Sequence, residues 1–163
     1  MKGLRYPITM LFFFVFTLYG ARPFNTDDAG TVSAGEYELE MGCDFWSDQA
    51  SLGLGFKHGI IERMNLGVGL DFDITPAGEE RFSGAEFGLK FAIVPDFFST
   101  SITATQGFSA YSLNGIITNC FGPAELDINL GYDATGIQEE AGSISFGIAL
   151  QYGLGLIDFG LET

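Results

Sequence analysis

The amino-acid sequence predicts an all-β protein, an antiparallel up-and-down transmembrane β-barrel of about eight strands plus a partial ninth, preceded by a signal peptide. Three observations predict this fold. Apolar residues alternate with other residues along most of the chain, the opposite face is rich in glycine, and aromatic residues stand near the ends of the alternating stretches. Together they favour a sheet whose apolar face meets lipid.

The alternation has the period of a β-strand. Between Glu36 and Phe45, apolar side chains occupy one face from Tyr37 onward, and Glu36, Glu38 and Glu40 lie on the other. Most of the stretches approach the 9 to 11 residues that a tilted strand needs to cross a bilayer. The expected strands cover residues 36–45, 51–57, 64–73, 85–93, 100–108, 111–119, 126–133 and 144–152, and a partial ninth covers 155–162.

Turns are expected between these stretches, at residues 59–63, 94–98 and 119–123 at the periplasmic end and at 47–50, 75–82 and 134–142 at the external end, although the two sets differ only weakly in length. Asn114-Gly115 is an alternative site for a tight hairpin turn. A turn there would leave one very long strand and a stub, whereas the turn at Phe121, Gly122 and Pro123 gives two strands of similar length.

The face opposite the apolar one separates a membrane barrel from a soluble one. A soluble barrel would expose Lys, Thr and Glu to water there, but many of these positions are glycine, which suits a narrow, crowded interior. Rings also fall near two levels, as in interfacial belts. The rings are Phe45, Trp46, Phe72, Phe108 and Tyr132 at one level and Tyr37, Phe91 and Tyr152 at the other.

The N-terminal residues predict export. Lys2 and Arg5 precede an apolar run over 8–18, and small residues follow at Gly20 and Ala21. The run is shorter than the roughly 20 residues of a transmembrane helix, so a retained anchor is the lesser alternative. We expect a signal peptide over 1–21, a periplasmic N-terminal segment over 22–34 and the barrel over 35–163, in the outer membrane of a Gram-negative cell.

Composition excludes some functions. The formal charge is −14, and removing residues 1–21, which hold two cations and no acid, leaves −16. Nucleic acid is therefore not an expected partner, because phosphate binding needs clustered Lys and Arg. Hydrophobic residues make up 47% of the chain, which argues against a disordered acidic protein. Cys43 and Cys120 match no metal spacing, and a disulfide between them is the less favoured alternative.

One motif resembles a known family. The stretch from Arg22 to Val32 contains Thr26, Asp27, Asp28 and Ala29 and leads into the first strand. It resembles the opening of an outer-membrane barrel family associated with the meta-cleavage pathway of phenol degradation. Residues 59–70, 86–91 and 121–132 also resemble that family. The resemblance implies transport of small, aromatic or apolar compounds. The chain stops at Thr163 without the closing strands or terminal aromatic residue of such barrels, so we expect an incomplete barrel.

Candidate site residues follow from the polar face of the predicted strands. Lys57 and Lys90 point the same way as many acids and are expected to form ion pairs inside the barrel. Asp27 and Asp28 either seat the N-terminal segment in or under the lumen or cap a turn. The lumen-facing candidates are Glu38, Glu40, Asp71, Asp73, Glu86, Asp127, Asp133, Lys57 and Lys90.

Enzymatic chemistry is not expected. His58, the one histidine, lies where we expect a solvated turn residue rather than a general base. Glu36, Glu38 and Glu40 share a face, but sequence fixes no further metal ligand, so a solvated face is favoured and neither metal nor cofactor is predicted.

The expected partners are outer-membrane lipid, small hydrophobic or cationic solutes and the barrel-assembly machinery. The expected function is a channel or transporter for small compounds, and the alternative is a structural or binding barrel whose lumen is filled by side chains.

Overall fold

The computed structural model describes residues 26–45, 50–75, 81–137, 140–154 and 158–163. These residues form one antiparallel sheet of nine strands in sequence order, so each strand pairs with its neighbours in the chain. The strands are β1 (Tyr37–Phe45), β2 (Ala50–Ile61), β3 (Met64–Thr75), β4 (Phe82–Val94), β5 (Phe98–Thr105), β6 (Tyr111–Phe121), β7 (Ala124–Ala134), β8 (Ser143–Gly153) and β9 (Asp158–Glu162).

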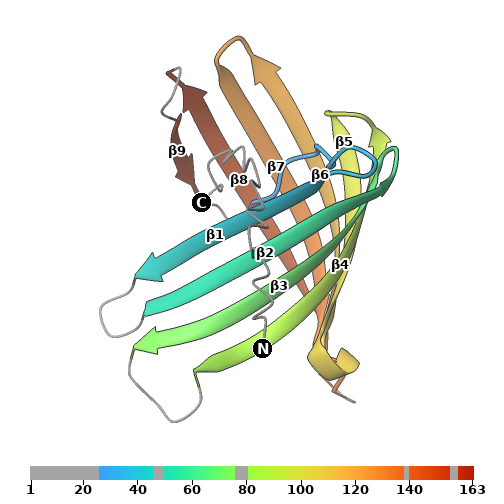
Figure 1. The fold of residues 1–163 in the computed structure, drawn as a ribbon, viewed down its shortest axis with the longest axis vertical. Helices are drawn as coiled ribbons and strands as arrows, with labels where there is room; N and C mark the ends of the chain where they lie inside the picture. The colour runs from blue at the N-terminus through green and yellow to red at the C-terminus, as the bar shows by residue number, and fades with distance from the viewer. Residues whose placement is uncertain (1–25, 46–49, 76–80, 138–139, 155–157) are drawn as a thin grey trace, which may run out of the picture.

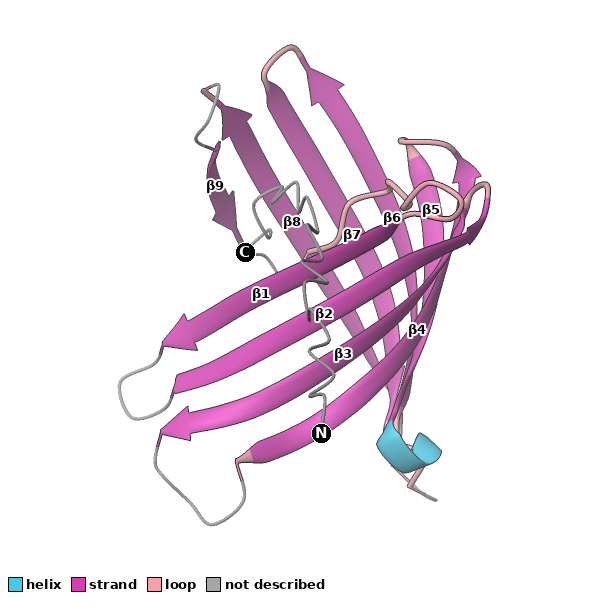
Figure 2. Ribbon diagram, in the orientation of Figure 1, coloured by secondary structure: helices cyan, strands magenta, loops and turns pink. Residues whose placement is uncertain are grey.

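The sheet curls into a half-barrel, with β1 to β4 forming one side and β6 to β9 the other (Figure 1). The described residues contain no α-helix, and a short 3-10 turn, Gln106–Phe108, follows β5 (Figure 2). β1 and β9 are the two edge strands of the sheet, and no described strand pairs with the outer side of either. Both edge strands have odd numbers in an antiparallel order, so they run in the same direction.

The all-β, antiparallel prediction is therefore confirmed, including the segment counted as a ninth strand. β9 pairs with β8 from Asp158 onward, and β1 does not pair with β8. Closure of the barrel is not observed among the described strands, which form a half-barrel. An antiparallel ring needs an even number of strands, and joining β1 directly to β9 would make a parallel pair.

The connections agree with the expected turns. Gly122 and Pro123 join β6 to β7, with Gly122 in the left-handed region at φ 62°. Asn114 and Gly115 lie inside β6, paired with Gly131 and Leu130, so the alternative hairpin turn is excluded. The β2–β3 turn consists of Glu62 and Arg63, later than the centre of the expected range, because β2 continues to Ile61.

Burial in this sheet is opposite to that of a soluble protein. Five of the buried residues are hydrophobic, and four of these are alanines, whereas seven are polar or charged. The large apolar side chains are exposed instead, among them Phe45, Phe87, Ile144 and Phe146. Most of these buried residues, among them Lys90, Ile116 and Asn129, lie on the concave face, the side of the sheet on which residues 26–30 lie. Among the described residues, no helix is long and apolar enough to cross a membrane.

Candidate functional site

Strand register brings the polar side chains together on the concave face. Residues directly opposite one another in neighbouring strands point to the same side of a sheet. One such row across β1 to β4 contains Glu38, Lys57, Gly67 and Gly88, and the next contains Glu40, Gly55, Gly69 and Glu86. The alternation of the sequence and the pairing of the strands therefore build a charged surface interrupted by glycine.

Lys57 forms the first ion-pair cluster of this face. Its Nζ lies 2.9 Å from Oε1 of Glu40 and 3.4 Å from Oε1 of Glu38, both on the neighbouring strand β1. These side chains are a quarter to nearly half exposed, so water screens the attraction. The expected pairing of Lys57 with acids on this face is observed.

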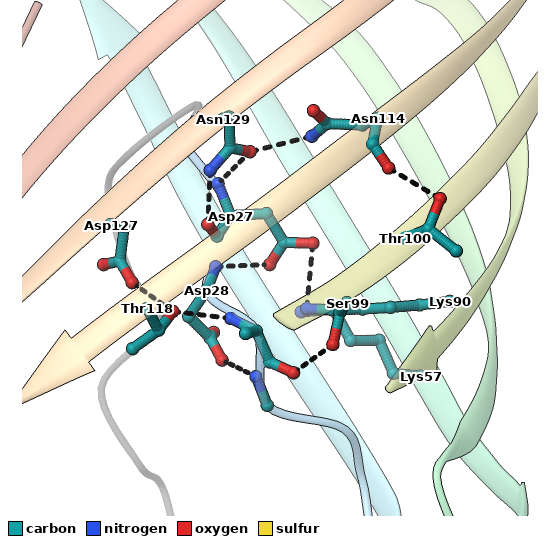
Figure 3. A network of polar contacts seen from close by, with 12 residues as sticks. Asp27, Asp28, Lys57, Lys90, Ser99, Thr100, Asn114, Thr118, Asp127 and Asn129 are labelled. Carbon is teal, nitrogen blue, oxygen red and sulfur yellow. Dashed lines mark hydrogen bonds and ion pairs between the residues drawn. The ribbon is translucent and has the colours of Figure 1, made fainter. Parts of the chain in front are cut away.

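Residues 26–30 cross the concave face and are held mainly through their main chain (Figure 3). The side-chain amide of Asn129 on β7 accepts a hydrogen bond from Asp27 N at 3.1 Å and donates one to Asp27 O at 2.7 Å. Thr118 Oγ1 on β6 accepts from Ala29 N at 2.7 Å, and Ser99 Oγ on β5 donates to Ala29 O. Ala29 is 0% exposed. Side chains from three strands thus bind the backbone of alternate residues.

Asp27 also forms an ion pair with the sheet. Its Oδ2 lies 3.0 Å from Nζ of Lys90 on β4, a lysine that is 6% exposed (Figure 3). Asp28 acts locally, since its Oδ1 accepts from Gly30 N at 2.6 Å. The two alternatives for this pair of aspartates therefore both occur. Asp27 seats the segment against the sheet, and Asp28 caps a turn.

Further contacts extend this network to both sides. Thr26 donates from its N and its Oγ1 to Oε1 of Glu162 on β9, at 2.5 and 2.6 Å. Thr118 donates to Asp127 Oδ1 at 2.6 Å, which fixes the hydroxyl so that its lone pairs face Ala29 N. The segment therefore connects β9 with the middle of the sheet.

Two glycines make room for the segment. A Cβ at Gly59 would overlap the carbonyl oxygen of Ser33, and one at Gly147 would lie 2.7 Å from Thr26 Oγ1. By contrast, a Cβ at Gly67 would meet its nearest atoms at 3.9 and 4.0 Å. Close approach of two backbones is a common reason for glycine within a strand. The sheet is therefore shaped to receive residues 26–33.

Cavities remain beside the segment. One of about 220 Å³ lies over β1 to β5 and is lined by Asp27, Lys57, Lys90, Glu86 and Asn65 among others. Asn65 is 3% exposed, and its Oδ1 has no hydrogen-bond partner within the described part of the chain. A second cavity of about 530 Å³ lies toward β8 and β9, lined by Thr26, Asn129, Ser145 and Glu162. Cavities of this size that have polar side chains in their walls hold water or small solutes.

The remaining lumen-facing candidates lie on the same face. Glu86 lines the cavity over β1 to β5 together with Thr103, and Asp71 and Asp133 are the acids that act on it electrostatically. Asp127 is fully buried beside Thr118, and Asp73 is opposite Ser51 in the register of β2 and β3. Acids therefore outnumber the two lysines on the described concave face.

One prediction about a single residue needs correction. His58 is not a solvated turn residue, because β2 extends three residues beyond it and its ring stacks on Tyr37 with centroids 4.2 Å apart. Its Nδ1 lies 2.9 Å from Glu36 O. The less favoured alternative, a disulfide between Cys43 and Cys120, is not formed. Trp46, in the expected aromatic level, and the predicted signal peptide lie outside the described residues.

Sequence reasoning did not single out the residues that bind the segment's main chain. Ser99, Thr118 and Asn129 are small polar residues spread over three strands, and none was a candidate. Their shared position on the face opposite the apolar one could have been predicted from the alternation of the sequence. No group of three or more His, Cys, Asp or Glu able to hold a metal ion occurs among the described residues.

Comparisons of the chain with protein-family models, with curated proteins and with solved structures each find no match.

Proposed function

We propose that this chain is an outer-membrane β-barrel protein that contacts lipid through its convex face and provides a polar, acidic interior for small solutes. One observation carries the membrane part of the proposal. The convex face exposes large apolar side chains, whereas the buried concave face is mostly polar. In water this arrangement would expose far more contiguous apolar surface than soluble monomers tolerate. In a bilayer, the same face is solvated by lipid tails.

Connection lengths support an outer-membrane orientation. The three connections after β2, β4 and β6 contain two, three and two residues, whereas those after β1, β3, β5 and β7 contain four, six, five and eight. The connection after β8 lies at the same end of the sheet as the short turns but contains four residues, as many as the connection after β1 at the other end. Outer-membrane barrels have short periplasmic turns and longer external loops. The short turns are therefore proposed to face the periplasm, on the side expected for residues 22–34.

The interior supports solute binding or passage. Cavities of about 220 and 530 Å³ adjoin the segment 26–30, and the acids around them favour neutral or cationic solutes. The resemblance noted above adds small aromatic or apolar compounds to this class. A second candidate function is a non-conducting structural or binding barrel, favoured because residues 26–30 and their partners fill part of the concave side.

Membrane fractionation tests the proposal. We expect the chain to sediment with outer membranes and, in detergent gels, to migrate differently before and after heating. Recovery as a soluble periplasmic monomer without detergent would contradict it. Conductance in planar bilayers then separates a channel from the non-conducting alternative.

A further inference from the structure

We propose that the concave face carries a binding site for an extended peptide, and that residues 26–30 occupy it as a tethered ligand. The inference rests on the proposed function only in placing this site inside a membrane barrel. In this site, the side chains of Ser99, Thr118 and Asn129 form hydrogen bonds with the peptide backbone, and Lys90 forms an ion pair with an acidic side chain of the peptide. Its ligand class is a peptide with an aspartate and, two residues later, a small residue.

The contacts have the geometry of peptide recognition. Asn129 satisfies both the N–H and the C=O of Asp27, and Thr118 and Ser99 together do the same for Ala29. Binding the main chain of alternate residues is how extended peptides are held elsewhere, with side-chain pockets adding specificity. The three strands β5, β6 and β7 supply these groups, so the site belongs to the sheet rather than to the segment.

Two side-chain positions would give this site its specificity. Asp27 meets Lys90, which is 6% exposed, so a neutral residue there would leave a buried ammonium without its carboxylate. Ala29 is 0% exposed, so a larger side chain would not fit. Gly59 and Gly147 leave room for the bound segment, since a Cβ at either would collide with residues of the N-terminal segment.

The test separates ligand from receptor after folding. A protease site is inserted between Ser33 and Ala34, which are both exposed, so that the full chain folds before it is cut. A fluorescent peptide with the sequence of residues 26–33 is then added to the cut protein in detergent, and exchange is followed by anisotropy. We expect saturable binding that unlabelled peptide reverses.

Variants then test the recognition. An Asp27→Asn peptide should bind about tenfold more weakly, because a charge-assisted contact is lost. Lys90→Met in the protein should remove that difference between the two peptides. An Ala29→Leu peptide should not bind, whereas a Thr31→Leu peptide, changed at a partly exposed position, should bind nearly normally.

Failure of folded, cut protein to bind the peptide would overturn the inference, as would equal binding of the unchanged peptide and the Asp27→Asn peptide. If cutting unfolds the sheet, the uncut chain answers the question through the unfolding midpoints of Asp27→Asn, Lys90→Met and the double variant. Additive effects there would overturn recognition of Asp27 by Lys90. Peptide binding by a protein that neither enters outer membranes nor conducts would contradict the proposed function and leave the peptide site intact.

Discussion

At the residue scale, the Asp27–Lys90 pair is the contact in which one substitution should matter most. Lys90→Met would leave the Asp27 carboxylate inside the sheet without its cation. Removing one partner of a buried pair costs several kcal/mol, but Asp27 is about a third exposed, so we expect a loss of roughly 1 to 3 kcal/mol in the free energy of unfolding. Urea unfolding followed by circular dichroism would measure it.

Lys57→Met is the matched control. Lys57 also pairs with carboxylates, but its side chain is 23% exposed, against 7% for Lys90, so we expect a loss below about 1 kcal/mol. Equal losses in the two variants would mean that Lys90 is solvated like Lys57 and does not anchor the segment.

Glycine positions give a second prediction at this scale. Gly59→Ala should destabilise the protein by about 1 to 3 kcal/mol, because its Cβ would collide with the backbone of Ser33, which cannot move as a flexible side chain does. Gly67→Ala on the neighbouring strand should be neutral or slightly stabilising, since its surroundings leave room. Unfolding curves of both variants check this, and an unaffected Gly59→Ala would mean that the segment does not lie there.

At the scale of elements, the strands were predictable because each carries its own period of two. The pattern located every strand from β1 to β8 and identified the Gly122-Pro123 turn. The position of residues 26–30 was less predictable. Asn129 lies 102 positions from Asp27 in the sequence and bonds its main chain, and a main-chain contact requires no particular side chain in the segment. His58 was misplaced because β2 continues past the glycine that suggested a turn.

The β6–β7 turn allows a prediction about the stability of one hairpin. Gly122 has φ 62°, a conformation that costs other residues about 1 kcal/mol or more, so Gly122→Ala should destabilise the hairpin by about that amount. Gly42→Ala, at a position with no atom within 4 Å of the added Cβ and no positive φ, is the control. Thermal or urea unfolding compares the two, and a harmless Gly122→Ala would place the turn elsewhere.

At the scale of the whole molecule, the acidic side chains of the concave face create a negative electrostatic potential on that side of the sheet. The concave face carries Glu40, Glu86, Asp71 and Asp133 along with other acids, whereas its described cations are Lys57 and Lys90. A wall of low dielectric keeps such a field from being screened as it would be in bulk water. Any conductance should therefore prefer cations.

Neutralising two of these acids tests the field directly. Glu40→Gln with Glu86→Gln should shift the reversal potential under a salt gradient toward zero, because both side chains line the cavity beside Asp27. Asp96→Asn with Glu140→Gln removes the same amount of charge from exposed connections and should change the reversal potential little. Anion preference, or equal responses of the two double variants, would mean that solutes do not pass the acidic face. A membrane-inserted protein that conducts nothing, before or after release of residues 26–30, would favour the binding barrel instead.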